Sequence, residues 1–462
     1  MRELDGSPLR ATEIAALARS AEGVQVTEEA LDRVARGARL ADEVAEHRAV
    51  YGRSTGVGAN RDQHVDDPVV AARRLVASHG TARAAPRSRE RTRALLLVRL
   101  QQLLAGGSGV APAVVSALAG LVSPGAEPEA PEGGSVGTGD LAACAAVAGA
   151  IEAAGVPVGP GDALALLSSN AGVLGDAALA VTDLAELSRA ALVTAALTCV
   201  GVGGNTEAYG EGAQAATPID GAREVARTLQ ALVGEVTPAR IQDPFALRTL
   251  PQVHGPFVDA LTATTALVER LAGTASENPV FGPWGVAHHG GFHAAYLAQS
   301  LDALVLATAQ AGQLVLARVS MLMSPELTGL PAFLADGTSG ASGAMLLEYA
   351  AASALGDLRA LATPASLQSV VLSRGLEEDA SFASLAARQA LDAVEPLRTL
   401  VAAELVCAHR CLTARRAPLT PVLAEVVDRL TGLGTGLADR DLAPDLEAAV
   451  DALPDLAALV AS

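Results

Sequence analysis

The stretch that decides the fold runs from His293 to Met323 and reads HAAYLAQSLDALVLATAQAGQLVLARVSMLM. Apolar residues recur along it at the spacing of a helix, and no proline interrupts them. A helix of this length predicts a bundle of long, nearly parallel helices, extended by the association of subunits.

The rest of the chain has the same helical character. Half of its residues are hydrophobic and only 2% are aromatic, so the core must consist of Ala, Leu and Val, and Ala has the highest helix propensity. Further helices are predicted over residues 28–50, 68–78, 89–104, 140–154, 160–198, 218–236, 257–273, 343–361 and 380–415, and near the C-terminus. Asp140 is predicted to cap the helix over residues 140–154. The fold class is therefore all-α, and residues 121–139 are its longest Pro/Gly-rich loop.

The charge and cysteine content argue against several classes of protein. A net charge of −18 repels phosphate backbones, so we expect no nucleic-acid partner, and the Arg-rich stretch 83–93 is interpreted as a solvated loop and helix start. The four cysteines are scattered, and Cys407 and Cys411 are interpreted as buried thiols without a metal. Residues 1–12 lack a signal-peptide core, and no clean membrane-spanning run is present. A cytoplasmic protein is expected.

Four polar islands interrupt the aliphatic background. They are YGRSTGVG at 51–58, PEGGSVGTGDLA at 131–142, QDPFALR at 242–248 followed by PQV at 251–253, and SENP at 276–279 followed by GGFH at 290–293. In this order, over about residues 10–420, they resemble the motifs of the histidine, phenylalanine and tyrosine ammonia-lyases and the related aminomutases.

That resemblance implies an architecture and a chemistry. Family members are α-helical tetramers with an L-aspartase/fumarase-like central bundle, and each active site is assembled from three subunits. They eliminate ammonia from an α-amino acid, or move its amino group, with the electrophile methylidene-imidazolone, which forms from an internal Ala-Ser-Gly. We accordingly divide the chain into residues 1–200, which carry active-site and prosthetic-group loops, and residues 201–462, the long-helix bundle with the C-terminal helices, within one continuous helical unit.

Two residues carry over as the catalytic base and the carboxylate-binding group. Tyr51 matches the family's loop tyrosine, and a phenol acts as a base only when its pKa is lowered. Arg248 matches the arginine that pairs with the substrate carboxylate, and Gln252 would support it. The alternatives are a locally packed aromatic ring at position 51 and a structural ion pair at position 248.

Two further residues indicate the substrate. His79, which follows Ser78, resembles the selectivity position of the histidine-specific lyases, and Glu378 matches their acidic residue. Together they favour an aromatic or histidine-like amino acid with a polar side chain, or a derivative of one. His288, His289 and His293 form a cluster, but no carboxylate stands at ligand spacing, so no metal is expected.

The sequence departs from the family pattern around the electrophile. Gly137-Thr138-Gly139 stands in place of Gly-Ala-Ser-Gly, so one residue is missing and the serine is lost. Ser168, Ser169 and Asn170 replace Asn-Gly-Thr, and Phe245 replaces a tyrosine. By resemblance, Ser168 and Phe245 surround the prosthetic group and are candidate catalytic residues, as are Tyr51 and Glu378. Asn170 and Phe292 are candidates for substrate binding. Gly137-Thr138-Gly139 could formally cyclise to a methyl-substituted analogue, but it would need the strained loop geometry with one residue fewer. Methylidene-imidazolone is therefore expected from the family but not from this loop.

Three functions remain open on the sequence alone. The first is ammonia elimination or aminomutation of an aromatic or histidine-like amino acid. The second is a repurposed enzyme without methylidene-imidazolone, which would use Tyr51 for a different acid–base elimination, addition or cyclisation. The third is a non-catalytic binding protein on the same scaffold.

Overall fold

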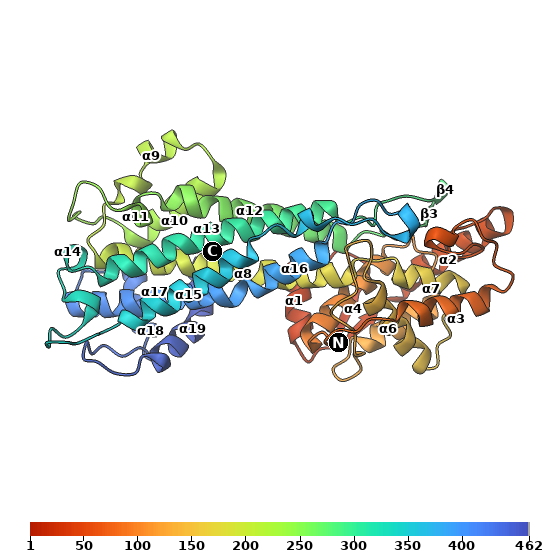
Figure 1. Cartoon of the computed structure of the whole chain (residues 1–462), viewed down its shortest axis with the longest axis horizontal. Coiled ribbons are helices and arrows are strands. Elements are labelled where there is room, and N and C mark those ends of the chain that lie inside the picture. Colours follow the sequence, from red (N-terminus) through yellow and green to blue (C-terminus); the bar gives the residue numbers. More distant parts are fainter. Residues whose placement is uncertain (461–462) are drawn as a thin grey trace. The chain divides into compact units, whose positions relative to one another are not determined.

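The computed structural model describes residues 1–460, and most of them are helical (Figure 1). The all-α class predicted from the long apolar helices is confirmed. The described residues form two compact units, described separately below: unit 1 contains residues 1–182, 264–302 and 364–391, and unit 2 contains residues 183–263, 303–363 and 392–460. The chain passes between them several times, and the division near residue 200 stays a prediction.

Unit 1 is built around one buried helix. Every residue of α4 from Thr92 onward is buried, and the helix packs against α1, α2 and α5. The elements wholly in unit 1 are β1 (Arg2–Leu4), α1 (Ala11–Arg19), β2 (Val24–Val26), α2 (Glu28–His47), η1 (Gly58–Asn60), α3 (Pro68–His79), α4 (Arg89–Leu104), α5 (Pro112–Leu121), α6 (Leu141–Ala153), α7 (Pro160–Leu167), β3 (Val280–Gly282), β4 (Gly285–Ala287), η4 (Ala365–Gln368) and η5 (Ser373–Gly375). Strands β1 and β2 pair in parallel, with Arg2 opposite Val24, and β3 and β4 form an antiparallel hairpin.

Unit 2 is centred on α17, which packs against α15 and α19. Its core contains the ion pair between Arg318 and Glu404, and both side chains are buried. The elements wholly in unit 2 are η2 (Thr206–Tyr209), α9 (Glu211–Ala216), α10 (Asp220–Val233), α11 (Phe245–Arg248), α14 (Pro325–Thr328), η3 (Ala332–Leu334), α15 (Met345–Leu361), α17 (Val394–Arg415), α18 (Pro421–Arg429) and α19 (Ala443–Ala458). Residues of α8 (Ala171–Gly201), α12 (Leu250–Ala272), α13 (Ala295–Met323) and α16 (Ala383–Asp392) belong to both units.

Several helix predictions need correction. The helix predicted over residues 160–198 is interrupted at 168–170, because Ser168 has a non-helical ψ of 68° and its neighbours bond elsewhere. The helix predicted over residues 380–415 is divided between α16 and α17. Helix α12 begins seven residues before the predicted start at 257 and contains Pro256. Helices α1 and α5 were not predicted from the sequence.

Asp140 has a different role from the one predicted. It occupies the N-cap position of α6 but makes no side-chain capping bond there. Its Oδ2 instead accepts a hydrogen bond of 2.9 Å from the backbone N–H of Val173, in the first turn of α8. The carboxylate therefore caps a helix that follows it by about thirty residues in sequence but adjoins it in the fold.

The Arg-rich stretch was also misinterpreted as solvated. Arg87 and Arg91 both pair with the buried Asp176, and Arg91 also binds Glu132 at 2.7 Å. Arg93 is buried and donates hydrogen bonds to backbone carbonyls, including that of Leu17 at 2.8 Å. These arginines are structural, because Arg87 and Arg91 pair with a buried carboxylate and Arg93 binds backbone carbonyls inside unit 1.

Two helical stretches, Pro160–Gly201 and Ala295–Met323, are long and apolar enough to cross a membrane by length and composition. The most apolar part of the first is 89% buried inside the protein, as expected for the core helix of a globular protein. Length and composition alone are therefore weak evidence that either stretch spans a membrane.

Candidate functional site

Tyr51 lines a cavity of about 600 Å³ in unit 1. The residue lies in the turn that follows α2. Other segments contribute Asn278, His288, Phe292 and Glu377 to the same cavity, so the first and fourth polar islands meet there. The volume falls within the usual range for a small-molecule site.

The phenol of Tyr51 is held by its own loop. Its Oη accepts a hydrogen bond of 2.7 Å from the backbone N–H of Gly58, at the beginning of η1. Gly58 has a φ of +56°, which a glycine adopts without strain. The backbone N–H of Tyr51 donates to Nε2 of His288 at 3.2 Å. The Oη atom is thereby fixed while its own hydrogen stays available for donation.

Burial raises the pKa of Tyr51, and the negative charge of Glu377 raises it further. The Gly58 N–H and the positive charge of Arg61 act in the opposite direction. Both stabilise the phenolate, because each places positive charge near Oη. In this chain the net pKa is above that of a free tyrosine, so the lowered pKa that a base requires is not reached by these residues alone.

The segment 168–170 joins the cavity to the core. The Oγ of Ser168 accepts a hydrogen bond of 3.1 Å from the N–H of Asn278, and the side-chain amide of Asn170 donates to the carbonyl of Phe292. Both of these partners line the cavity of Tyr51. Ser168, Asn170 and Phe292 are thus brought together, although only Phe292 reaches the cavity wall.

A buried polar chain lies beneath this segment. Ser169 donates to Gln102 at 2.7 Å, Arg99 donates to the same Gln102 at 2.8 Å, and Arg99 pairs with Glu277 at 2.8 Å. All four side chains are buried. These hydrogen bonds hold residues 168–170 in place, because breaking one would leave a buried charge or polar atom without a partner.

The altered loop is bound by hydroxyl groups from the segment that precedes and begins α16. Ser381 donates to the carbonyl of Gly137 at 3.0 Å, and Ser384 donates to the carbonyl of Ser135 at 2.7 Å. Ser135 in turn donates to the carbonyl of Gly139 at 3.2 Å. Gly137 and Gly139 are buried, and Thr138 is half-buried.

The residues of this loop do not fit the family's electrophile. Methylidene-imidazolone derives its exocyclic methylene from a serine, and position 138 is a threonine. If Gly137-Thr138-Gly139 takes the place of the triad, Gly137 stands where the triad has alanine, and a Cβ there would lie 2.0 Å from the Oγ of Ser381. That is too close for an alanine unless the loop moves. We therefore derive no chemical step through this group.

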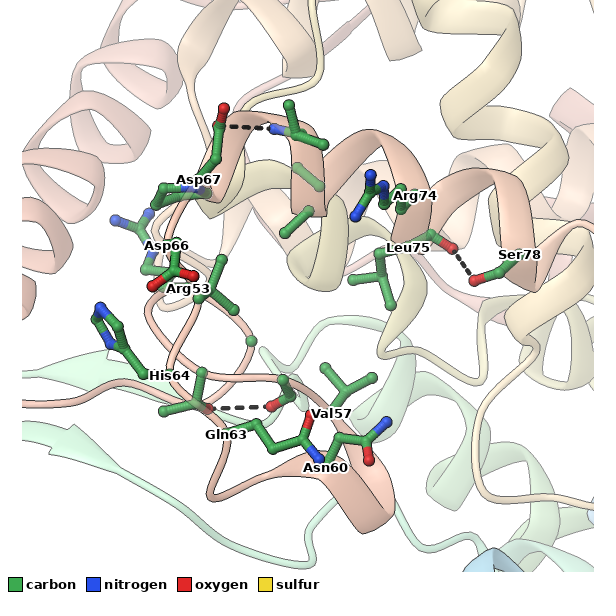
Figure 2. Close-up of a pocket in the computed structure, with 18 of the residues that line it drawn as sticks. Arg53, Val57, Asn60, Gln63, His64, Asp66, Asp67, Arg74, Leu75 and Ser78 are labelled. Carbon is green, nitrogen blue, oxygen red and sulfur yellow. Dashed lines mark hydrogen bonds between the residues drawn. The ribbon is translucent and has the colours of Figure 1, made fainter.

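A second cavity, of about 690 Å³, is formed by residues between Gly52 and His79, among them Asn60, His64 and Ser78 (Figure 2). His79 also lines it. Its Nδ1 lies 2.9 Å from the carbonyl of Leu75, and Ser78 bonds the same carbonyl at 3.1 Å. Thr55 lines both this cavity and that of Tyr51. Tyr51 and His79 therefore line two adjacent cavities in unit 1 and do not share a single cavity.

Glu378 is exposed and lines neither cavity, whereas its neighbour Glu377 lines the cavity of Tyr51. Within residues 1–460 there is no cluster of three His, Cys, Asp or Glu side chains suited to a metal ion. His289, one of the clustered histidines, lies within 2.9 Å of the carbonyl of Glu277 and accepts from the N–H of Gly291 at 2.8 Å.

The remaining predicted residues lie in unit 2. The half-buried Arg248 donates to Gln242 at 2.7 Å, and its guanidinium carbon lies 4.8 Å from the centre of the Phe245 ring. The buried Nε of Arg248 has no partner among the described residues. Gln252 is exposed and donates to Thr217 at 3.2 Å. Arg248 and Phe245 are thus together, and Gln252 makes its hydrogen bond elsewhere in unit 2.

Sequence reasoning missed four participants. Gly58 acts through its backbone N–H. Arg99 and Gln102 lie in α4, whose sequence is typical of a buried structural helix. Glu277 was within a quoted motif but was not singled out. The charge of Arg99 within an apolar helix sequence is the signal that could have revealed the pair, because a charge is rarely buried without a partner.

The fold defines the class of protein, which is the all-α lyase architecture. The histidine ammonia-lyase of Trypanosoma cruzi superposes with a TM-score of 0.90 at 24% identity, covering 100% of this chain and 95% of that one. The tyrosine aminomutase of Streptomyces globisporus superposes with a TM-score of 0.89 at 25% identity, covering 98% and 97%.

The family is shown by sequence. A model described as aromatic amino acid lyase matches residues 9–158 and 150–431. The histidine ammonia-lyase of Symbiobacterium thermophilum is 32% identical, over 96% of this chain and 94% of its own, and that of Streptomyces coelicolor is 32% identical, over 99% and 97%. The chain belongs to the aromatic amino acid lyase family, which confirms the resemblance read from the motifs. It is an enzyme of the carbon–nitrogen lyase kind, and its relatives support an ammonia-lyase or aminomutase activity.

Proposed function

We propose that this enzyme eliminates or moves the amino group of a small aromatic or histidine-like amino acid, with Tyr51 as the residue that transfers a proton. The observation that carries the proposal is the Oη of Tyr51, fixed by the Gly58 N–H at 2.7 Å inside a cavity of about 600 Å³. A phenol that is held in position and backed by a backbone donor is suited to general acid–base catalysis.

Arg248 is the proposed ligand of the substrate carboxylate. Its planar guanidinium has a buried Nε without a partner among the described residues, and it packs on the Phe245 ring. Such an arginine has donors left for a two-point contact with a carboxylate. We further propose a homotetramer with shared active sites, acting in the cytoplasm. The exposed apolar side chains of Leu306, Leu346 and Tyr349 on long helices support the association of copies.

We also propose that the enzyme works without methylidene-imidazolone. The threonine at position 138 and the crowding around Gly137 support this view. Without an electrophile, removal of an unactivated β-proton is difficult, so this variant of the proposal requires a substrate that is already activated for elimination, addition or cyclisation.

The intact mass of the protein distinguishes an enzyme that carries methylidene-imidazolone from one that works without it. Cyclisation and dehydration of any triad lose water and therefore lower the mass. Because we propose that the prosthetic group is absent, we expect an unmodified mass. A mass lower by water would contradict this proposal. The second measurement is an incubation with amino acids, followed by ultraviolet absorbance for unsaturated acids and by thermal stabilisation for binding.

The Tyr51→Phe variant tests the role of the phenol. Turnover is expected to fall by about a hundredfold or more, the usual contribution of a general acid or base. Because burial raises the pKa of Tyr51, the phenolate is scarce at neutral pH and the rate should increase as the pH rises towards that pKa. Unchanged turnover in Tyr51→Phe would rule out this role, and stabilisation without any turnover would favour the non-catalytic alternative.

A further inference from the structure

The carboxylate that reaches the cavity of Tyr51 belongs to Glu377 and not to Glu378. The reason is local. Leu372 and Glu377 form a short antiparallel bridge, with the Leu372 N–H donating to the Glu377 carbonyl at 2.9 Å. This bridge closes the turn around η5 and places residue 377 on the cavity side, while residue 378 is exposed to solvent.

The same turn packs against the loop of Tyr51. Elements η1 and η5 are in contact, and a Cβ built on Gly58 would lie 3.1 Å from the Oγ of Ser373. Gly58 is the residue whose N–H binds the phenol. The segment that carries Glu377 therefore adjoins the segment that positions Tyr51.

Glu377 is half-buried, and the hydrogen bonds that it makes within residues 1–460 are those of its backbone with Leu372, which leave its carboxylate without a partner. The other charged or titratable groups that line the cavity are occupied differently. Arg61 and Asp62 lie 3.7 Å apart and carry opposite charges, so the charged side chains of the lining, with Glu377, sum to −1. His288 accepts the N–H of Tyr51, and burial lowers its pKa, so it stays neutral. Glu377 thus leaves one uncompensated negative charge beside the phenol.

We propose that Glu377 binds the ammonium group of the amino-acid substrate in the cavity of Tyr51. This assignment rests on the proposed function and names the charged group that the site recognises. A carboxylate without a partner, in a cavity that also contains the aromatic rings of Tyr51 and Phe292, suits an ammonium ion, because both the charge and the ring faces attract a cation.

Binding of a cation at Glu377 also changes the pKa of Tyr51, the proposed base. The negative charge of Glu377 disfavours the phenolate of Tyr51. A bound ammonium group offsets that charge, so the pKa of Tyr51 falls when the cation binds. By linkage, the cation binds more tightly when Tyr51 is ionised. The substrate therefore activates the residue that removes its proton.

The first experiment compares Glu377→Gln with Glu378→Gln in the full-length protein. Each change removes one negative charge from adjacent positions, but only one of them lines the cavity. The titration of Tyr51 is followed as the ultraviolet difference spectrum of the phenolate, with Tyr51→Phe as the blank for the other three tyrosines. Glu377→Gln should lower the pKa of Tyr51, and Glu378→Gln should leave it unchanged. Equal effects of the two changes would overturn the assignment.

The second experiment adds histamine, which has an imidazole and an ammonium group but no carboxylate, so its binding does not require Arg248. Histamine should lower the pKa of Tyr51 in the wild type and in Glu378→Gln. In Glu377→Gln its affinity should be weaker by about tenfold or more, as expected for the loss of a charge-assisted hydrogen bond. The same shift in all three proteins, or no shift in any, would contradict the proposal.

These readouts require no turnover, so they separate this proposal from the proposed function. If Glu377→Gln leaves the titration unchanged while Tyr51→Phe abolishes activity, only the ammonium site is wrong. If the titration responds but no amino acid is converted, only the proposed reaction is wrong. The Glu377 side chain makes no hydrogen bond within the described residues, so Glu377→Gln should fold like the wild type, which circular dichroism checks.

Discussion

At the scale of single residues, Gly137 is the most constrained position of the altered loop. Its φ is +88°, where a side chain is strained, and a Cβ there would also lie 2.9 Å from the N–H nitrogen of Ala383. The loop has lost a residue and now packs directly on the segment that leads into α16. That packing leaves room for a glycine but not for an alanine.

Gly137→Ala should therefore destabilise the protein more than a change that alters only the backbone preference. Gly125 is the matched control, because its φ is +85° and a Cβ added there would meet nothing within 4 Å. We expect Gly125→Ala to cost about 1 kcal/mol and Gly137→Ala at least about 2 kcal/mol more, from strain plus overpacking. Denaturant unfolding measures both, and equal costs would show that the loop yields easily.

Individual residues show how much of the candidate site could be predicted from the sequence. Tyr51 was predicted as a site residue because its Gly-rich loop matches a family motif, and the structure places it in the lining of a cavity. The acidic residue was placed one position away from the cavity, since the bridge between Leu372 and Glu377 sets the direction of the side chain and leaves no mark in the sequence. The Gly58 N–H was missed because a backbone donor has no sequence signal of its own.

At the scale of elements, most helices followed from their periodicity, while their interruptions did not. Ser168, Ser169 and Asn170 are compatible with a helix, but the side chains of Ser168 and Ser169 bond Asn278 and Gln102, and the Ser169 carbonyl accepts the N–H of Asp140. Tertiary contacts of this kind override local propensity. Arg87 and Arg91 illustrate the same limit, because their partner Asp176 is more than eighty residues away.

Helix α17 offers a test of how much its buried ion pair stabilises unit 2. Glu404 binds Arg318 through two bonds of 2.7 and 2.8 Å and accepts from Thr198 at 2.7 Å, with both charges buried. Glu395, in the same helix, is exposed and pairs with Arg398 on the surface. Removing one member of a buried pair leaves the other uncompensated, whereas a surface pair contributes little.

We expect Glu404→Gln to lower the free energy of unfolding by about 3–5 kcal/mol. Glu395→Gln should change it by no more than about 0.5 kcal/mol. Guanidinium denaturation followed by circular dichroism measures both variants. Similar losses from the two substitutions would mean that the pair on α17 is solvated in solution.

At the scale of the whole molecule, the candidate residues are divided between two compact units. Tyr51, His79 and Glu377 lie in unit 1, and Arg248 lies in unit 2. The long helices also expose apolar side chains within unit 2: Leu306 on α13 is 49% exposed, and Leu346 and Tyr349 on α15 are 63% and 65% exposed. Apolar side chains exposed on long helices favour association with other copies.

If the site draws Tyr51 and Arg248 from different subunits, two inactive variants should complement each other. Tyr51→Phe and Arg248→Met would each be inactive alone as homotetramers. Co-expressed in equal amounts, they would form mixed tetramers in which about a quarter of the sites combine an intact Tyr51 with an intact Arg248. Recovery of about that share of turnover, at a mass that light scattering assigns to a tetramer, is the expected result. No recovery in mixed tetramers would place both residues of each site on one chain, because random mixing then yields no site with both groups intact.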